Sequence, residues 1–257
     1  ARHNILLCLT IFLESNKKRS GVENMPKVLE VFPGNLTIKY TPQHISSSQR
    51  SWLDCRRYWA LSSVMRLRPK DATEDLRMEF GNILHEILGT WYVTPLDKRE
   101  QGLLFSLMDV SLSGRKWEPW MLKEGKEKLE EALQIFWKRL GQDKIVANGR
   151  ETELRVVITK NVRPYLGYID WYYFDGDTLI IEDLKTSMTA IDPSRYTLFN
   201  PAANDYLWAA QKVFPKAKDI MFSYLFVTPE RAWRVRVPRH DVSNQGTELA
   251  QLIKEQD

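Results

Sequence analysis

Apolar residues recur every three or four positions in two long stretches of the first half of the chain, which predicts amphipathic helices at about 73–92 and 121–140. A further helix is expected after the serines at 46–48, because serine is a good N-cap and apolar residues follow it. Residues 26–45 look like short strands and turns, and the stretch 94–120 carries loop signals. This half of the chain therefore predicts a mainly helical region.

The pattern changes near residue 150 to short, dense apolar runs bounded by turn residues. These runs predict strands at 153–158, 165–174, 178–184, 220–227 and 233–237, and helices at 201–214 and 242–256. The sequence Asp175-Gly176-Asp177 predicts a tight turn between the second and third strands. Together the two halves predict an α/β fold, in which helices flank a central β-sheet and a helical region packs before it.

Length and composition suit one large domain. The chain has 257 residues, is 43% hydrophobic, and contains enough Trp, Tyr and Phe for a substantial core. Its net charge of +4, from 37 basic and 33 acidic residues, is compatible with nucleic acid without requiring it. Cys8 and Cys55 are the only cysteines, too few for a disulfide scaffold, so we expect a reducing, cytoplasmic (intracellular) setting.

The N-terminal segment contains the apolar run Ile5 to Leu13, which is too short to span a bilayer, and we expect no membrane partner. No small-residue cleavage site follows this run, which argues against a secretory signal. Because Met25 could be a natural start, residues 1–24 are expected to be an N-terminal extension of uncertain origin. Residues 25–257 then form a single domain, with a helical part at about 45–145 and an α/β part at about 150–240.

Two carboxylates and a lysine fall on the predicted hairpin. Gly167-Tyr168-Ile169-Asp170 lies in its first strand, and Asp183-Leu184-Lys185 ends its second strand. Side chains alternate along a strand, so Asp183 and Lys185 share a face, and the hairpin can bring Asp170 beside them. This group could bind Mg²⁺ or Mn²⁺ and a phosphate. The alternative is a solvated, charged face, because Asp-x-Lys is a common pattern.

Four motifs occur in order along the chain: Gly81-x-x-x-His85 on a helix, a strand that carries a glutamate, Gly167-x-x-Asp170, and Asp183-x-Lys185-Thr. This set resembles the RecB-like branch of the PD-(D/E)XK nuclease superfamily, which includes CRISPR-associated exonucleases, over about residues 47–226. The resemblance implies a restriction-endonuclease-like α/β core with a mixed central sheet. It also implies a divalent-metal-dependent DNA nuclease, an exonuclease acting on ends or single strands in repair, recombination or viral or CRISPR-type processing.

The same resemblance assigns roles to individual residues. It makes Lys185, Asp170 and Asp183 catalytic. The ligands of Mg²⁺ or Mn²⁺ would be His85, Asp170, Asp183 and the Leu184 backbone carbonyl. Glu153 matches an acidic position found near such sites, although a surface or salt-bridged role is equally open. Glu182 should point to the face opposite Asp183, and it becomes a ligand only if the strand register slips.

The chain departs from the family pattern in two places. The family commonly has Gln-x-x-x-Tyr on the helix after its lysine; aligning Tyr206 here puts Ala202 at the glutamine, and aligning Trp208 puts Asn204 there. Tyr206 is therefore either a site residue or a core aromatic. Some relatives hold an iron–sulfur cluster with four cysteines. Cys55 matches the early one, but no cysteine follows it, so we expect no iron–sulfur cluster.

Basic and aromatic residues also suggest a DNA path. Candidate DNA contacts are Arg56, Arg57, Tyr58, Arg163 and Asn204. Basic groups beside aromatic rings suit single-stranded DNA, although ordinary solvated charge is the alternative for any one of them. The expected partner is DNA, single-stranded or with free ends, and replication or recombination proteins stay open as partners. The alternative function is a catalytically weak DNA-binding or complex-forming subunit with the same fold, and an RNA substrate also stays open.

Overall fold

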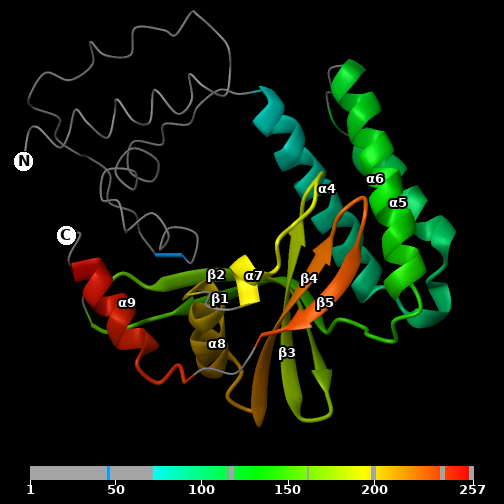
Figure 1. Ribbon diagram of the computed structural model, residues 1–257. Helices are drawn as coiled ribbons and strands as arrows, with labels where there is room; N and C mark the ends of the chain where they lie inside the picture. Colours follow the sequence, from blue (N-terminus) through cyan, green and yellow to red (C-terminus); the bar gives the residue numbers. More distant parts are fainter. Residues whose placement is uncertain are drawn as a thin grey trace, which may run out of the picture. The chain divides into compact units, whose positions relative to one another are not determined.

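The computed structural model describes residues 45–46, 72–113, 115, 119–160, 162–197, 201–237 and 241–254. In these ranges five strands form one sheet in the order β1-β2-β3-β4-β5 (Figure 1). The strands are β1 (Gly149–Val156), β2 (Tyr165–Asp175), β3 (Thr178–Thr186), β4 (Asp219–Val227) and β5 (Ala232–Arg236). Strands β3 and β4 run parallel, and the other neighbouring pairs are antiparallel. The predicted α/β fold with a mixed central sheet is confirmed.

Helices cover both faces of this sheet (Figure 1). One face packs against α4 (Ala72–Val93), α5 (Gln101–Ser113) and α6 (Pro119–Leu140), with a short 3-10 turn, η3 (Leu96–Lys98), between the first two. The other face packs against α8 (Pro201–Val213) and α9 (Gln245–Lys254). A short helix, α7 (Ser194–Thr197), follows β3. None of the described helices has an apolar run long enough to cross a membrane.

The main error of the sequence interpretation concerns α5, which occupies much of the stretch expected to be loop. Leu104, Met108 and Leu112 of this helix are buried at a spacing of four residues, against the core shared with α4 and α6. Its glycine and serines lower helix propensity, so tertiary packing stabilises it where local preference does not. Short helix α7 was also not expected. The predicted elements at 26–45 and after 46–48 lie outside the described residues, apart from Ile45 and Ser46.

At the end away from their turn, strands β2 and β3 separate, and we call this point the fork. Its turn is Gly176-Asp177, closed by the pair Asp175↔Thr178, and Gly176 has a φ of 59°, a backbone conformation that glycine adopts without strain. The ladder between the two strands runs back only to Trp171↔Glu182. Beyond that rung β2 continues beside β1, and β3 continues beside β4. The first residues past the rung are Asp170 and Asp183, so the two carboxylates lie where the strands part.

Strand β2 also changes its packing at this point. Tyr165 and Ile169 belong to the core cluster of α8 and α9, whereas Trp171 and Tyr173 of the same strand belong to the cluster of α4 to α6. The change falls at Asp170, which is only partly buried. The fork therefore opens between the two helical layers, and residues of both layers can reach it.

Candidate active site

Helix α4 reaches the fork through a close contact between its backbone and β3. A Cβ added at Gly81 would lie 3.0 Å from Thr186 Oγ1, so the helix passes close to the end of β3. His85 lies one turn later on the same side of α4. Its Nδ1 atom is 3.2 Å from Asp170 Oδ1, and its side chain is 38% exposed. The glycine thus explains how a helical histidine comes to contact a carboxylate on β2.

The two oxygens of Asp170 face different elements. Oδ1 faces His85 of α4, and Oδ2 accepts a hydrogen bond of 2.6 Å from the Leu184 backbone N–H of β3. In this way the carboxylate bridges the gap in the ladder between β2 and β3. The N–H and C=O of one strand residue point to the same edge of the strand, so the Leu184 carbonyl also faces the fork.

Asp183 and Lys185 project from β3 on the same face, as strand alternation requires. Lys185 Nζ is 2.5 Å from Asp183 Oδ2. In the described part of the chain Asp183 Oδ2 is buried and has no hydrogen bond of good geometry, so this ion pair is what compensates its charge. The ammonium also lies 5.8 Å from the ring centroid of Tyr224 and 6.0 Å from that of Tyr196, within the range of cation–π attraction.

The electrostatics of the site are those of crowded negative charge. Burial raises the pKa of Asp183, and the neighbouring charge of Asp170 raises it further, although Lys185 works in the opposite direction. Burial lowers the pKa of His85, but its hydrogen bond and charge interaction with Asp170 outweigh burial, and the net pKa is raised. The pKa of Lys185 is raised in the same way, because Asp183 outweighs burial. Lys185, and His85 when it is protonated, therefore compensate the two carboxylates.

Within the described residues, no three His, Cys, Asp or Glu side chains are arranged so that they could hold a metal ion as they stand. The contacts above give the reason, since Asp183 pairs with Lys185 and Asp170 pairs with His85. The donor set is nevertheless of the right chemistry, because carboxylate oxygens suit Mg²⁺ and Mn²⁺ and imidazole suits many divalent ions. A divalent cation at the fork would relieve the like-charge repulsion that raises the pKa of Asp183, so the residues fit such an ion.

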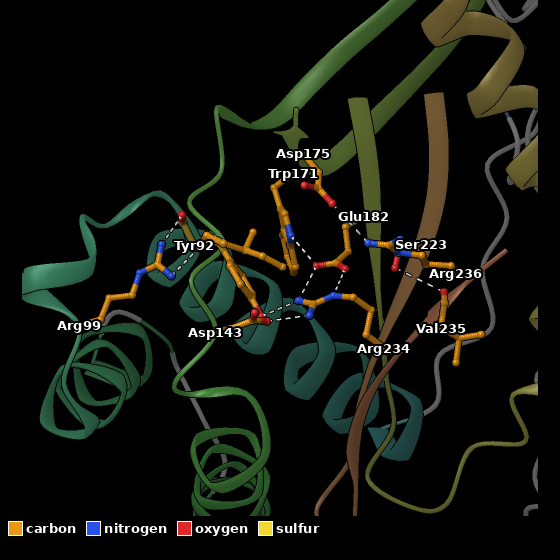
Figure 2. Close-up of polar contacts among 11 residues, drawn as sticks. Tyr92, Arg99, Asp143, Trp171, Asp175, Glu182, Ser223, Arg234, Val235 and Arg236 are labelled. Carbon is orange, nitrogen blue, oxygen red and sulfur yellow. Dashed lines mark hydrogen bonds and ion pairs between the residues drawn. The ribbon is translucent and has the colours of Figure 1, made fainter. Parts of the chain in front are cut away.

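Glu182 lies on the other face of β3 from Asp183, as strand alternation predicts. Its side chain is fully buried and forms contacts with Trp171 and Arg234 on the side of the sheet covered by α4 to α6 (Figure 2). The register does not slip, because Glu182 pairs with Trp171 and Ser223 in the neighbouring strands. The condition under which Glu182 would become a ligand is therefore not met.

Glu153 is a surface residue of β1. Its carboxylate accepts a hydrogen bond of 2.8 Å from Arg155 Nε and one of 3.2 Å from the Tyr168 hydroxyl. The sequence left two roles open for Glu153, one in the site and one in a surface salt bridge, and the structure shows the salt bridge. Tyr168 lies two residues before Asp170 on β2, and 53% of it is exposed.

Tyr206 of α8 lies near the fork. A Cβ at Gly167 would lie 3.0 Å from its ring, and the ring stacks on Phe222 with centroids 5.7 Å apart. Burial raises the pKa of its hydroxyl, and the charges of Asp183 and Asp170 raise it further. Tyr206 is therefore both a packed aromatic residue and a neighbour of the carboxylates.

The candidate DNA contacts are only partly visible. Arg56, Arg57 and Tyr58 lie outside the described residues. Arg163 is half-buried just before β2, and Asn204 is half-buried on α8. The Oδ1 atom of Asn204 is buried without a hydrogen-bond partner in the described part of the chain.

Sequence reasoning missed three residues near the site. Tyr196 comes from the unexpected helix α7, and Tyr224 lies opposite Asp183 in the parallel register, so both depend on tertiary structure. The third is Glu151, which the rungs Arg150↔Trp171 and Thr152↔Ile169 place opposite Asp170. Its φ of 46° is unusual for a residue other than glycine, and no feature of the sequence indicates it.

A match to a family model shows which superfamily the chain belongs to. Residues 46–256 match the PD-(D/E)XK nuclease superfamily. The chain belongs to this superfamily. PD-(D/E)XK nucleases generally act on DNA and use divalent metal ions, in agreement with the chemistry of the fork. A search of curated proteins found no match.

One solved structure has a similar fold. A candidate exonuclease from Eubacterium rectale superposes with a TM-score of 0.51 at 12% identity, over 88% of this chain and 89% of that one. A protein named SSO0001 gives a TM-score of 0.37 at 13% identity, over 97% of this chain and 85% of that one. At these identities the first likeness shows the fold alone.

Proposed function

We propose that this chain is a divalent-metal-dependent deoxyribonuclease of the RecB-like branch, with an exonuclease preference for DNA ends or single strands. The observation that carries the proposal is the fork itself, where Asp170, Asp183 and Lys185 meet His85 of α4. A helical histidine in contact with the carboxylate of β2 supports the RecB-like assignment, because it belongs to the motif order of that branch.

Each residue of the site has its own proposed role. Asp170, Asp183, His85 and the Leu184 carbonyl would hold Mg²⁺ or Mn²⁺. Such an ion, when bound, supplies positive charge that activates water and offsets the charge of the phosphate. With a cation at the carboxylates, the Lys185 ammonium is free to face the substrate phosphate, where it stabilises developing negative charge. No nucleophilic side chain is required, and none is assigned.

The preference for DNA ends or single strands is supported by two further observations. The structurally similar protein from Eubacterium rectale is named a candidate exonuclease, which agrees with this preference. Tyr168 is an exposed aromatic residue of β2, two residues before Asp170, and an unpaired base could stack on it. Cys8 and Cys55 cannot supply four ligands, so the proposed cofactor is Mg²⁺ or Mn²⁺ without an iron–sulfur cluster.

The test is cleavage of end-labelled DNA, single- and double-stranded, linear and circular, with Mg²⁺, Mn²⁺ or EDTA. Asp183→Asn removes a site charge with little change of shape, and Asp177→Asn is its matched control. Asp177 lies at the turn of the same hairpin, 67% exposed and paired with Lys218. We expect metal-dependent loss of linear DNA by the wild type and Asp177→Asn, and none by Asp183→Asn.

Each of the other possible outcomes would contradict a part of this proposal. Cutting of circular DNA would make the protein an endonuclease, and equal cutting by Asp183→Asn would remove this residue from the site. Absence of cleavage by the wild type together with tight DNA binding would favour the catalytically weak subunit.

A further inference from the structure

A buried charge lies directly behind the candidate site. Glu182 is 0% exposed and lies on the face of β3 that packs against α4 to α6. Its Oε2 atom accepts hydrogen bonds from Trp171 Nε1 at 3.0 Å and from Arg234 Nη2 at 3.1 Å, and its Oε1 atom pairs with Arg234 Nε (Figure 2). Glu182 of β3 thus contacts Trp171 of the neighbouring strand β2 and, across β4, Arg234 of β5.

Arg234 extends this set of contacts to the helices. Its Nη1 atom donates to Asp143 Oδ2 at 2.6 Å, and its Nη2 atom donates to the Tyr92 hydroxyl at 3.0 Å. The ring of Tyr92 in turn stacks on Trp171, with centroids 4.9 Å apart and an interplanar angle of 23°. The contacts of Tyr92, Trp171, Glu182 and Arg234 therefore close into a ring, and Asp143 is joined to it through Arg234. We call these five residues the Glu182 clasp (Figure 2).

Members of the clasp are neighbours of the site residues along the chain. Trp171 follows Asp170, Glu182 precedes Asp183, and the pair Trp171↔Glu182 is the last rung before the fork. Tyr92 lies seven residues after His85 on α4, which is two helical turns and therefore the same side of the helix. Each of the three segments that bring a carboxylate or the histidine to the fork is thus held by one clasp residue.

Packing alone does not explain a charge at this position. Ile180 and Leu184, on the same face of β3, are apolar and buried against the same helices. A buried ion pair costs so much desolvation that apolar residues of similar volume are often equally stabilising or better. Directional contacts, unlike apolar ones, fix the relative position of the groups that they join.

We propose that the Glu182 clasp is a positioning device that sets the separation of Asp170 and Asp183 at the fork, with Trp171 and Glu182 as its positioning residues. Ligand groups must be held within about 0.5 Å of the productive geometry to bind a metal ion well. The metal-binding part of this inference rests on the proposed function, whereas the positioning part concerns the protein alone.

The test compares two substitutions of a fully buried tryptophan. Trp171→Phe keeps an aromatic ring against Tyr92 and removes the donor to Glu182, which retains Arg234, together with part of the ring area. Trp91→Phe is the matched control, because Trp91 is also 0% exposed in the same cluster, and its Nε1 atom has no hydrogen-bond partner in the described part of the chain. Both variants lose similar ring area, so a purely structural effect should be similar in the two.

Two measurements report on the fork. The first is hydrogen exchange of the Leu184 amide in metal-free protein, since this N–H is bonded to Asp170 and reports how closely β3 holds that carboxylate. The second is Mn²⁺ affinity by calorimetry. For Trp171→Phe we expect exchange about 10-fold faster and Mn²⁺ affinity about 10-fold weaker, the range found when groups that orient metal ligands are altered. For Trp91→Phe, neither the exchange rate of the Leu184 amide nor the Mn²⁺ affinity should change by more than about 2-fold. The two variants are compared at temperatures equally far below their own melting temperatures.

A third variant tests the contact itself. Glu182→Gln weakens the ion pair with Arg234 as well as the acceptor for Trp171, so it should show both changes. Adding Trp171→Phe to the Glu182→Gln protein should have a smaller effect than Trp171→Phe alone, because the contact that it removes is already weakened. Equal exchange and affinity in Trp171→Phe and Trp91→Phe would overturn the clasp and leave the nuclease proposal standing. A wild type without Mn²⁺ binding would overturn the nuclease proposal, and the Leu184 exchange would still decide the positioning role.

Discussion

Gly81 of α4 lies against Thr186 of β3 so closely that a Cβ on the glycine would be 3.0 Å from Thr186 Oγ1. One turn further along the helix, His85 Nδ1 is 3.2 Å from Asp170 Oδ1. The two contacts depend on each other, since a helix pushed away from β3 would also withdraw the histidine. The glycine of the Gly-x-x-x-His motif is thus explained by space, independently of any resemblance.

The first prediction concerns this glycine. Gly81→Ala should be tolerated, because the Thr186 hydroxyl can rotate away and alanine gains up to about 1 kcal/mol of helix propensity. Gly81→Val should lower the free energy of unfolding by about 1–3 kcal/mol, as overpacking does, and should also reduce cleavage. Urea denaturation and the DNA assay measure the two effects.

Gly102→Val is the control for this prediction, because Gly102 is exposed on α5 and, among the described residues, its Cβ position meets only the Glu100 side chain, at 3.8 Å. It carries the same change of residue without the contact. A Gly81→Val protein as stable and as active as Gly102→Val would show that α4 does not depend on the close approach.

The second prediction separates catalysis from metal binding at Lys185. Lys185→Met removes the ammonium that now pairs with Asp183, so the carboxylate is released for a cation. We expect kcat to fall by about 100-fold or more, as when a group that stabilises transition-state charge is removed. Mn²⁺ affinity should stay the same or increase. Lys218→Met, at the exposed pair with Asp177, is the control. An equal loss of turnover and affinity would make Lys185 a structural partner of the ligands.

Local rules were enough to predict much of this site. The turn at Gly176 and the period of two along each strand place Asp183 and Lys185 on one face and Glu182 on the other, whatever the rest of the fold does. The helix of His85 follows from its apolar stripe. These features depend on residues close in sequence, and so single-sequence reasoning can reach them.

Features that depend on distant residues could not be predicted. Arg234 is 52 residues from Glu182, and neither residue carries a signal that it is buried or that it pairs with the other. Helix α5 contains residues of low helix propensity and forms because three of its side chains enter the core. The left-handed backbone of Glu151 has no local signal either, because the residue is not glycine. In each case tertiary structure overrides or supplements the local preference.

The third prediction uses the raised pKa of His85. A folded-state pKa above the ordinary value means that protonation stabilises the fold, fully below the unfolded pKa and no longer once the pH rises through the folded pKa. In EDTA, the loss of thermal stability caused by His85→Gln should therefore be larger at pH 5 than at pH 8. Melting curves at both pH values check this, with Asn82→Gln of the same helix as the control. A loss independent of pH would show that the histidine contributes packing alone.

The fourth prediction concerns the stability of the Glu182 clasp. Arg234→Met leaves Glu182 and Asp143 without their cation in a buried environment, which should cost about 3–5 kcal/mol of unfolding free energy. Changing Glu182→Met in the same protein removes one of the unpaired charges, so the double variant should recover about 1–3 kcal/mol. Urea denaturation of the metal-free proteins gives both values.

Arg236→Met is the control for this last comparison, because Arg236 lies two residues further along β5 and is 55% exposed, 3.7 Å from the exposed Asp175 (Figure 2). A surface pair of this kind contributes at most about 1 kcal/mol, so its loss should be small. If Arg234→Met cost no more than Arg236→Met, Glu182 would have to be neutral or hydrated in the folded protein. A double variant less stable than Arg234→Met would instead mean that Trp171 needs the Glu182 carboxylate even without the arginine.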